Sequence, residues 1–245
     1  MNQELILSVL SFAVIPVLAM IIGGIIASFY PPKAKLRSIL HHFAAGVVFA
    51  VVAVELLPDI MKKHNVVATS IGFALGVVVM LGLKYLLGEK ESGSDGEEKV
   101  ETVSISMFTG IGVDILIDGF LIGIVFSAGA KEGRLLTFAL AIEMLSLGLA
   151  LASSMSEAKT SRQKIITIIA GLSLLIFVGA GIGATLLQQV SEEVLEAVLS
   201  FGLAALLFLI TEELLVEAHE EPETPLITST FFAGFLLFLI LGMVG

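Results

Sequence analysis

The sequence predicts an all-α polytopic membrane protein, and three observations support this fold class. Of its 245 residues, 57% are hydrophobic, and the mean hydropathy is +1.04. Only 15% are charged, against roughly 25% in soluble domains. The apolar residues gather in eight runs of the length that a bilayer-spanning helix needs, about 20 residues. Within lipid each run must satisfy its own backbone hydrogen bonds, so each is expected to be a helix.

The eight runs are separated by short polar segments such as YPPKAK, MKKHN and EEPETP, which are typical of helix ends. The predicted spans are Glu4–Tyr30, Leu36–Ile60, Val66–Leu87, Val103–Ala128, Leu135–Ser156, Ile165–Leu187, Val198–Val216 and Leu226–Val244. No basic residue precedes the first run, so we expect a permanent span rather than a cleaved signal peptide. No segment has room for a soluble domain, and residues 1–245 are predicted to form a single transmembrane domain.

The basic residues predict the orientation in the membrane. With the N-terminus outside, nine lysines and arginines lie on the inner side and four on the outer side. Cytoplasmic loops carry the excess of basic residues, so both termini are expected outside, in a multi-pass protein of the cell membrane. The longest polar segment, residues 88–101, is acidic and rich in glycine and serine, and is predicted to be a flexible cytoplasmic loop.

Composition excludes several classes of function. The chain has no cysteine, so disulfides and thiolate metal ligands are excluded. Its net charge of −10 argues against nucleic acid as a partner. There is no GxxxxGKS-type phosphate loop, and no histidine–serine or histidine–acid pair lies within the apolar runs, so no enzyme is predicted. The expected partners are the bilayer and a metal ion. A homodimer is a candidate assembly, and no tightly bound cofactor is expected.

Three carboxylates interrupt the apolar runs near their centres. Asp114 and Asp118 are one helical turn apart in GVDILIDGFLIG, and Glu143 lies near the middle of the next run. A short loop joins the two runs, so all three acids can meet at one depth. Each charge at the bilayer centre costs about 2.5–3.5 kcal/mol on insertion scales. The acids therefore either carry protons or share a cation, and a role confined to packing is the weaker alternative.

Other polar residues are candidates near this cluster. Ser146, one turn after Glu143, can add a hydroxyl. In TEELLVEAHEE, Glu212 or Glu213 is still deep in the apolar run, while Glu217 and His219 are expected nearer the interface. Glu55 and Asp59 end the second run on the predicted outer side. His41 and His42 begin that run on the inner side, and we interpret them as interfacial rather than ligating.

Four segments together resemble the ZIP (Zrt/Irt-like) metal transporters. HHFAAGVVFAVVAVELLPD is similar to the second helix of that family, with Glu55 at the position of its histidine. DILIDG and EMLSLG lie where the family has HNxxDG-like and HExPEG-like motifs, and EELLVEAH is similar to its EELIPEAH. The resemblance covers the whole chain. It implies a ZIP-like bundle of eight helices and transport of a divalent cation, usually zinc or iron.

The sequence departs from the family pattern at the metal centre. Asp114 and Glu143 replace histidines, and Ile115, Met144 and Leu147 stand where the family has further ligands. A two-metal centre is therefore not expected, but one site of oxygen ligands remains, from Asp114, Asp118 and Glu143 with Ser146 and Glu213. Oxygen ligands favour Mn²⁺, Mg²⁺ or Ca²⁺, with Fe²⁺ also allowed, over zinc.

The resulting hypothesis is transport of a divalent cation such as zinc, iron or manganese through a carboxylate site at the midplane. Entry is expected near Glu55 and Asp59, exit past Glu213 towards Glu217 and His219, and coupling to protons stays open. Two alternatives also stay open. One is a transport-dead relative that serves as a metal sensor or scaffold, and the other is a carrier of protons or of an organic solute.

Overall fold

The computed structural model describes residues 2–92, 105–186, 190–219, 222 and 224–244, and every element in these ranges is helical. The elements in chain order are α1 (Asn2–Phe29), α2 (Ala34–Val51), η1 (Val52–Leu56), α3 (Leu57–Lys63), α4 (Val66–Ser92), α5 (Ile105–Ala128), α6 (Ala130–Glu157), α7 (Arg162–Ser173), α8 (Leu175–Leu186), α9 (Glu192–Phe208), η2 (Leu209–Leu214), α10 (Leu215–Ala218) and α11 (Pro225–Val244). The labels η1 and η2 denote π-helical turns.

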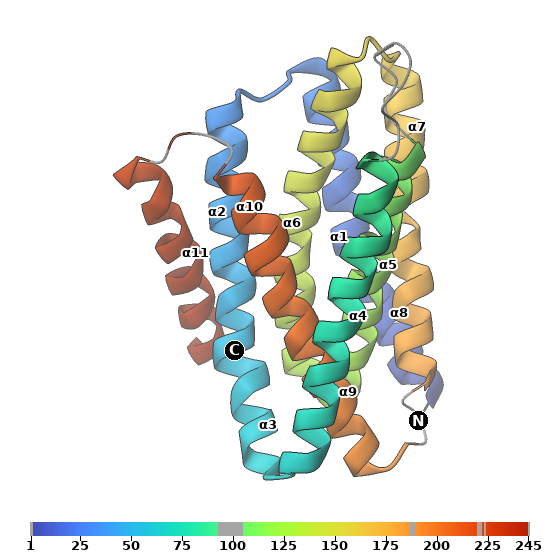
Figure 1. The fold of residues 1–245 in the computed structure, drawn as a ribbon, viewed down its shortest axis with the longest axis vertical. Coiled ribbons are helices and arrows are strands. Elements are labelled where there is room, and N and C mark those ends of the chain that lie inside the picture. The colour runs from blue at the N-terminus through green and yellow to red at the C-terminus, as the bar shows by residue number, and fades with distance from the viewer. Residues whose placement is uncertain (1, 93–104, 187–189, 220–221, 223, 245) are drawn as a thin grey trace.

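The prediction of an all-α membrane protein is confirmed. Eight helices among the described residues are long and apolar enough to cross a bilayer. The second of these spans joins α2, η1 and α3, the sixth joins α7 and α8, and the seventh joins α9, η2 and α10. The helices run side by side along the long axis of the molecule, and both termini lie in its lower half in Figure 1.

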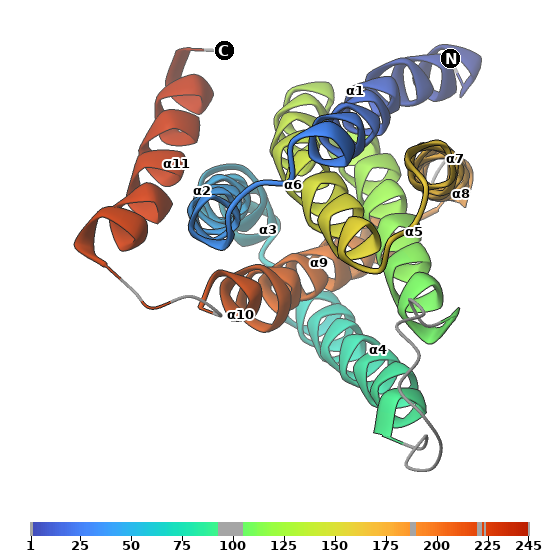
Figure 2. The same cartoon turned by 90° about the horizontal axis from the view of Figure 1, so that it is seen from above.

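The helices form two groups. In the first group α1 packs most extensively against α6, and α5 against α8; in the second, α2 packs against α11 and α4 against α9. The groups meet where α6 lies against α2 and α5 against α9. Seen from above in Figure 2, α2 and α6 lie next to each other, and α9 and α10 lie below them in the view, with α4 further out. The boundary between the groups is therefore formed by α2, α5, α6 and the α9–α10 span.

Glycines allow the closest backbone approach within the first group. A Cβ atom at Gly119 of α5 would overlap the carbonyl oxygen of Ile176 in α8, and one at Gly179 of α8 would overlap that of Leu116 in α5. Small residues permit such approach between helices in lipid, where packing rather than the hydrophobic effect holds them together. The spacing of α5 and α8 thus depends on a glycine in each helix.

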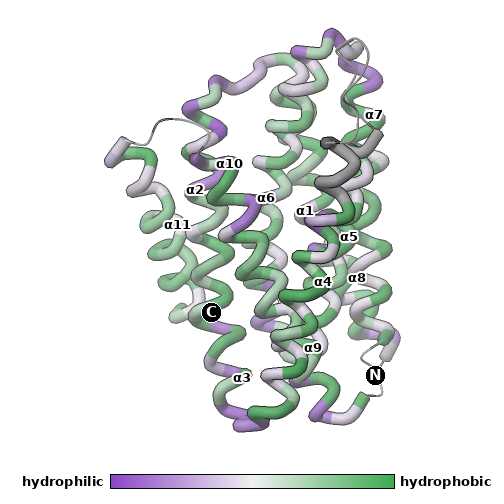
Figure 3. Tube along the Cα trace, in the orientation of Figure 1, coloured by the Kyte–Doolittle hydropathy of each residue, from purple (hydrophilic) through white to green (hydrophobic). Residues whose placement is uncertain are grey.

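The burial of the spans places α6 at the centre of the molecule. In the most apolar window of each span, 67% of residues are buried in α6, against 17% in α4 and in α11. Apolar side chains such as Leu75 and Val78 of α4 face outwards, as expected where lipid is the solvent. Figure 3 shows hydrophobic residues along the lengths of the helices and hydrophilic ones gathered largely at their ends.

Several boundaries differ from the sequence prediction, since α6 begins at Ala130 rather than Leu135 and α9 at Glu192 rather than Val198. Helix α4 continues through Ser92, so the start of the predicted loop 88–101 is helical. Residues 93–101 of that loop lie outside the described residues. By contrast, α5 and α6 are continuous α-helices, as expected for segments in which no proline interrupts the backbone.

Candidate metal-binding site

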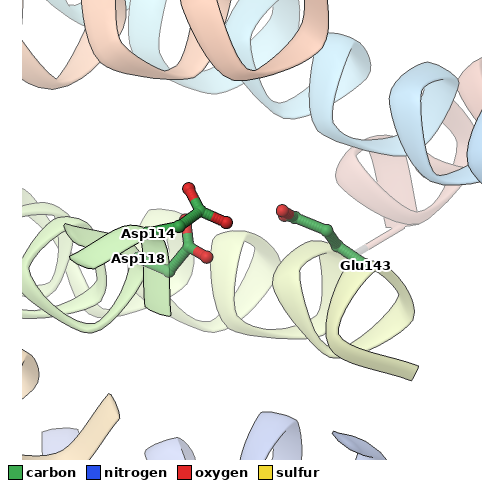
Figure 4. Close-up of side chains that lie close together, drawn as sticks. All are labelled: Asp114, Asp118 and Glu143. Carbon is green, nitrogen blue, oxygen red and sulfur yellow. The ribbon is translucent and has the colours of Figure 1, made fainter. Parts of the chain in front are cut away.

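Helices α5 and α6 bring the three predicted carboxylates together. Asp114, Asp118 and Glu143 each offer one oxygen, and these oxygens all lie within 4.8 Å of one another. Figure 4 shows Asp114 and Asp118 projecting from one helix and Glu143 reaching towards them from the next. Oxygens that share one ion at 2.0–2.6 Å are at most about 4–5 Å apart. The arrangement therefore has the dimensions of a single-ion site.

Two of these carboxyl groups are deeply buried, and each has one oxygen without a hydrogen-bond partner among the described residues. Asp118 is 2% exposed and Glu143 is 3% exposed. Oδ2 of Asp118 and Oε2 of Glu143 accept no hydrogen bond from any described residue. A buried polar atom left unpaired costs about 1–3 kcal/mol. Packing alone does not account for such atoms, whereas a cation between them would satisfy both.

The π-helical turn η2 separates the two candidate glutamates of the seventh span. The hydroxyl of Thr211 donates to the carbonyl of Leu207 at 2.9 Å, a side-chain bond that competes with the regular helical ladder. Glu212 turns away from the cavity described below and forms an ion pair with Lys84 of α4 at 2.5 Å. Glu213 instead lines that cavity together with Asp114 of α5.

A small cavity connects these groups at the boundary between the two helix groups. Its volume is about 30 Å³, enough for a water molecule or a small ion. The residues that line it are His41, Asp114, Glu143, Ser146, Leu147, Leu209, Glu213, Leu214 and Glu217. Among the described residues, no lysine or arginine lines this cavity. Its charge is therefore balanced by protons or by a bound cation.

The structure places His41 at this cavity rather than at a surface position. His41 is 4% exposed, and its Nδ1 lies 2.8 Å from Oε2 of Glu217, whose side chain is half-exposed. The oxygen is close enough for an ion pair, but neither ring nitrogen of His41 has a partner with hydrogen-bond geometry among the described residues. The sequence alone did not predict that His41 lies inside the protein at this cavity. The available signal was a histidine pair directly followed by the apolar run FAAGVVF.

The neighbouring histidines belong to the contact between α2 and α10. His42 is buried, and its Nδ1 lies 2.9 Å from the carbonyl oxygen of Ser38. Its ring packs edge-on against His219, with 5.3 Å between centroids. His219 in turn contacts the carbonyl oxygen of Leu215 through Nδ1, and Ser38 donates to the carbonyl of Ala218 at 2.7 Å. His219 does not line the cavity, in contrast to Glu217.

The two candidate entry residues lie apart from the cavity. Glu55 is half-buried in η1, with its carboxylate 3.9 Å from the ammonium of Lys131. Asp59 of α3 pairs with Lys62 at 3.0 Å. Neither acid lines the cavity, and both have basic neighbours. The structure therefore gathers Asp114, Asp118, Glu143, Ser146, Glu213 and Glu217 at one place and separates Glu55 and Asp59 from it.

Comparison with known proteins adds no further assignment. No family model matches the chain, and no curated protein matches it. The case for a function accordingly rests on the geometry of the site and on the motifs in the sequence.

Proposed function

We propose that the protein carries a divalent metal cation across the membrane through the carboxylates of α5, α6 and η2. The observation that carries the proposal is the convergence of Asp114, Asp118 and Glu143, with oxygens within 4.8 Å. Buried acids within spanning helices are costly and commonly mark ion pathways. The resemblance of four motifs to the ZIP transporters supports the same proposal, with a ZIP-like arrangement of the helices in the cell membrane.

The ion would occupy the space between α5 and α6 and exchange with protons there. Metal ligands must be deprotonated, so binding releases any protons that the carboxyl groups of the cluster carry. Ser146 and Glu213, which line the same cavity, can complete the oxygen ligands. Leu147 also lines it, at a position where the ZIP pattern has an acid, which is consistent with one ion rather than two.

The cavity supports a route on one side of the site. It extends from the buried Glu143 to the half-exposed Glu217, and so connects the carboxylates with the α10 end of the bundle. With both termini outside, as the basic residues predict, that end faces the cytoplasm. The ion would leave by this route, past Glu213 and Glu217. The cavity does not extend to Glu55 and Asp59 at the opposite end. For an ion to arrive from that end, the helices between these two residues and the carboxylates would have to move apart.

The test is uptake of Mn²⁺, Fe²⁺ and Zn²⁺ into liposomes that contain the wild-type protein or its Asp114→Ala variant. Glu212→Gln is the matched control, because Glu212 lies in the same π-helical turn as Glu213 but pairs with Lys84 away from the cavity. We expect uptake by wild type and control, and loss of uptake in Asp114→Ala. Equal rates in all three would sink the proposal.

A second candidate, a proton carrier, is favoured by the row of carboxyl groups along the cavity, from Asp114 and Glu143 to Glu213 and Glu217, since neighbouring acids are what a proton relay requires. The same liposomes distinguish the two. A proton current in the absence of added metal would support the relay. Metal binding without flux of any ion would indicate a sensor or scaffold instead.

A further inference from the structure

One residue that lines the cavity is a histidine, His41, which an all-carboxylate site would not include. His41 of α2 lines it, together with Glu217 of α10. The ring is 4% exposed, and Nε2 has no hydrogen-bond partner among the described residues. A buried imidazole nitrogen without a partner is unfavourable. Beside a cavity lined by carboxylates, it is a free nitrogen donor.

We infer that His41 supplies a nitrogen ligand to the ion held in the carboxylate cavity, and that this ligand makes the site prefer transition-metal ions over Mg²⁺ and Ca²⁺. The inference rests on the proposed function and deepens it by naming a residue that determines specificity. Carboxylate and hydroxyl oxygens suit Mg²⁺, Ca²⁺ and Mn²⁺ alike, whereas imidazole suits iron, zinc and related metals. Among the described residues His41 is not in the group whose ligand atoms lie within 4.8 Å of one another, so its ring moves towards Asp114 and Glu143 when it joins the ion. One imidazole added to their oxygens changes which ions bind best.

Glu217 stands where it can orient this imidazole. A histidine that binds a metal through one ring nitrogen commonly offers the other N–H to a carboxylate, which fixes the tautomer and the ring orientation. Oε2 of Glu217 lies 2.8 Å from Nδ1 of His41. Such a pairing leaves Nε2 with its lone pair available for the ion. Glu217 is thus a positioning residue that acts through His41.

The adjacent histidine provides a matched control. His42 is equally buried and lies in the same helix, but it does not line the cavity. Its Nδ1 already faces the carbonyl of Ser38, and its ring packs against His219. Substitution of His42 therefore removes an imidazole from the same part of α2 without touching the candidate ligands.

The first measurement is pulsed electron paramagnetic resonance of Mn²⁺ bound to the purified full-length protein with ¹⁵N-labelled histidine. We expect a coupling from one histidine nitrogen in wild type and in His42→Gln, and none in His41→Gln. The wild-type spectrum is decisive even where a variant fails to fold. Bound Mn²⁺ with no histidine coupling in wild type would overturn the inference while leaving the carboxylate site intact.

The second measurement is calorimetric titration with Zn²⁺ and Mg²⁺. In His41→Gln we expect the Zn²⁺ affinity to fall at least tenfold, the order of effect seen for groups that support metal ligands, and the Mg²⁺ affinity to change less than about threefold. His42→Gln should match wild type for both ions. An unchanged ratio of the two affinities in His41→Gln contradicts the role of His41 alone. A wild-type protein that binds none of the three ions overturns the proposed function as well.

Discussion

The two π-helical turns found among the described residues carry similar side chains but have different surroundings. Turn η1 contains Glu55, and turn η2 contains Glu212 and Glu213. Glu55 has the ammonium of Lys131 at 3.9 Å and lies outside the cavity. Glu213 lines the cavity together with Asp114 of α5 and Glu143 of α6. Widened helical turns often occur at functional sites, yet only one of these two meets a carboxylate cluster.

The turns also arise from different causes. Pro58 is the second residue of α3, just after η1, and its missing N–H deprives the carbonyl of Val54 of a helical hydrogen bond. Turn η2 contains no proline, and there the hydroxyl of Thr211 bonds to the carbonyls of the preceding turn. A disturbed helical ladder therefore makes room for a glutamate in both places. The charges on neighbouring helices decide whether that glutamate is neutralised or forms part of a site.

The largest effect is expected from Asp118→Asn. It removes one negative charge and one ionised ligand from a buried position, and we expect Mn²⁺ affinity to fall about 100-fold, which corresponds to roughly 2.7 kcal/mol. The control is Glu55→Gln, which changes the glutamate of the other π-helical turn and should leave affinity within about threefold of wild type. Calorimetric titration measures both. Equal losses in the two variants would remove the distinction between the turns.

The next effect concerns pH. Protons and metal compete for the same carboxyl oxygens, so Mn²⁺ affinity should fall as pH is lowered, by at least about tenfold between pH 7 and pH 5.5. More than one proton should be released per ion bound. Asp118→Asn should flatten this dependence, because it removes one titrating group, whereas Glu55→Gln should keep the wild-type slope. Titrations in buffers of different ionisation enthalpy count the protons, and affinity that is constant over this range would place the metal elsewhere.

A smaller effect separates the two glutamates within η2. Glu213→Gln should weaken Mn²⁺ binding about tenfold, since Gln keeps one oxygen donor but loses the charge. Glu212→Gln should change binding less than twofold, because Glu212 pairs with Lys84 outside the cavity. The same titration compares the two variants, and the reverse order of effects would show that the assignment of these neighbours is inverted.

The smallest effect is on stability. Lys131→Met leaves the half-buried Glu55 without its cation and the carbonyl of Gly242 without its 2.9 Å hydrogen bond. We expect a loss of about 1 kcal/mol in the free energy of unfolding. Lys84→Met breaks an exposed ion pair with Glu212, and the expected cost is below about 0.5 kcal/mol. Thermal unfolding in detergent should rank the two variants in this order.

The sequence predicted the helices better than it predicted the composition of the site. Long apolar runs fixed the number of candidate spans, because each must be a helix in lipid, and the i, i+4 spacing of Asp114 and Asp118 put both on one face. The short loop between α5 and α6 brought Glu143 within reach. These inferences depend on contacts that are local along the chain.

The contribution of α2 could not be predicted in this way. His41 reaches the cavity because α2 packs against α6 and α10, and that contact joins residues far apart in sequence. Whether Glu212 or Glu213 faces the acids likewise depends on the widened turn η2, which shifts the rotation of the helix after Thr211. The position of a π-helical turn could not be predicted from the sequence. Helical periodicity alone therefore left both Glu212 and Glu213 as candidates.

The unequal exposure of the acids along the cavity has a consequence for hydration. Glu217 is half-exposed, whereas Glu143 is almost completely buried. An ion moving between them would give up its water molecules in stages, with carboxylate oxygens replacing them one by one. Such a gradient discriminates by the rate at which an ion sheds water as well as by affinity. Mg²⁺, which dehydrates reluctantly, would be held back at the hydrated end even where the inner oxygens could bind it.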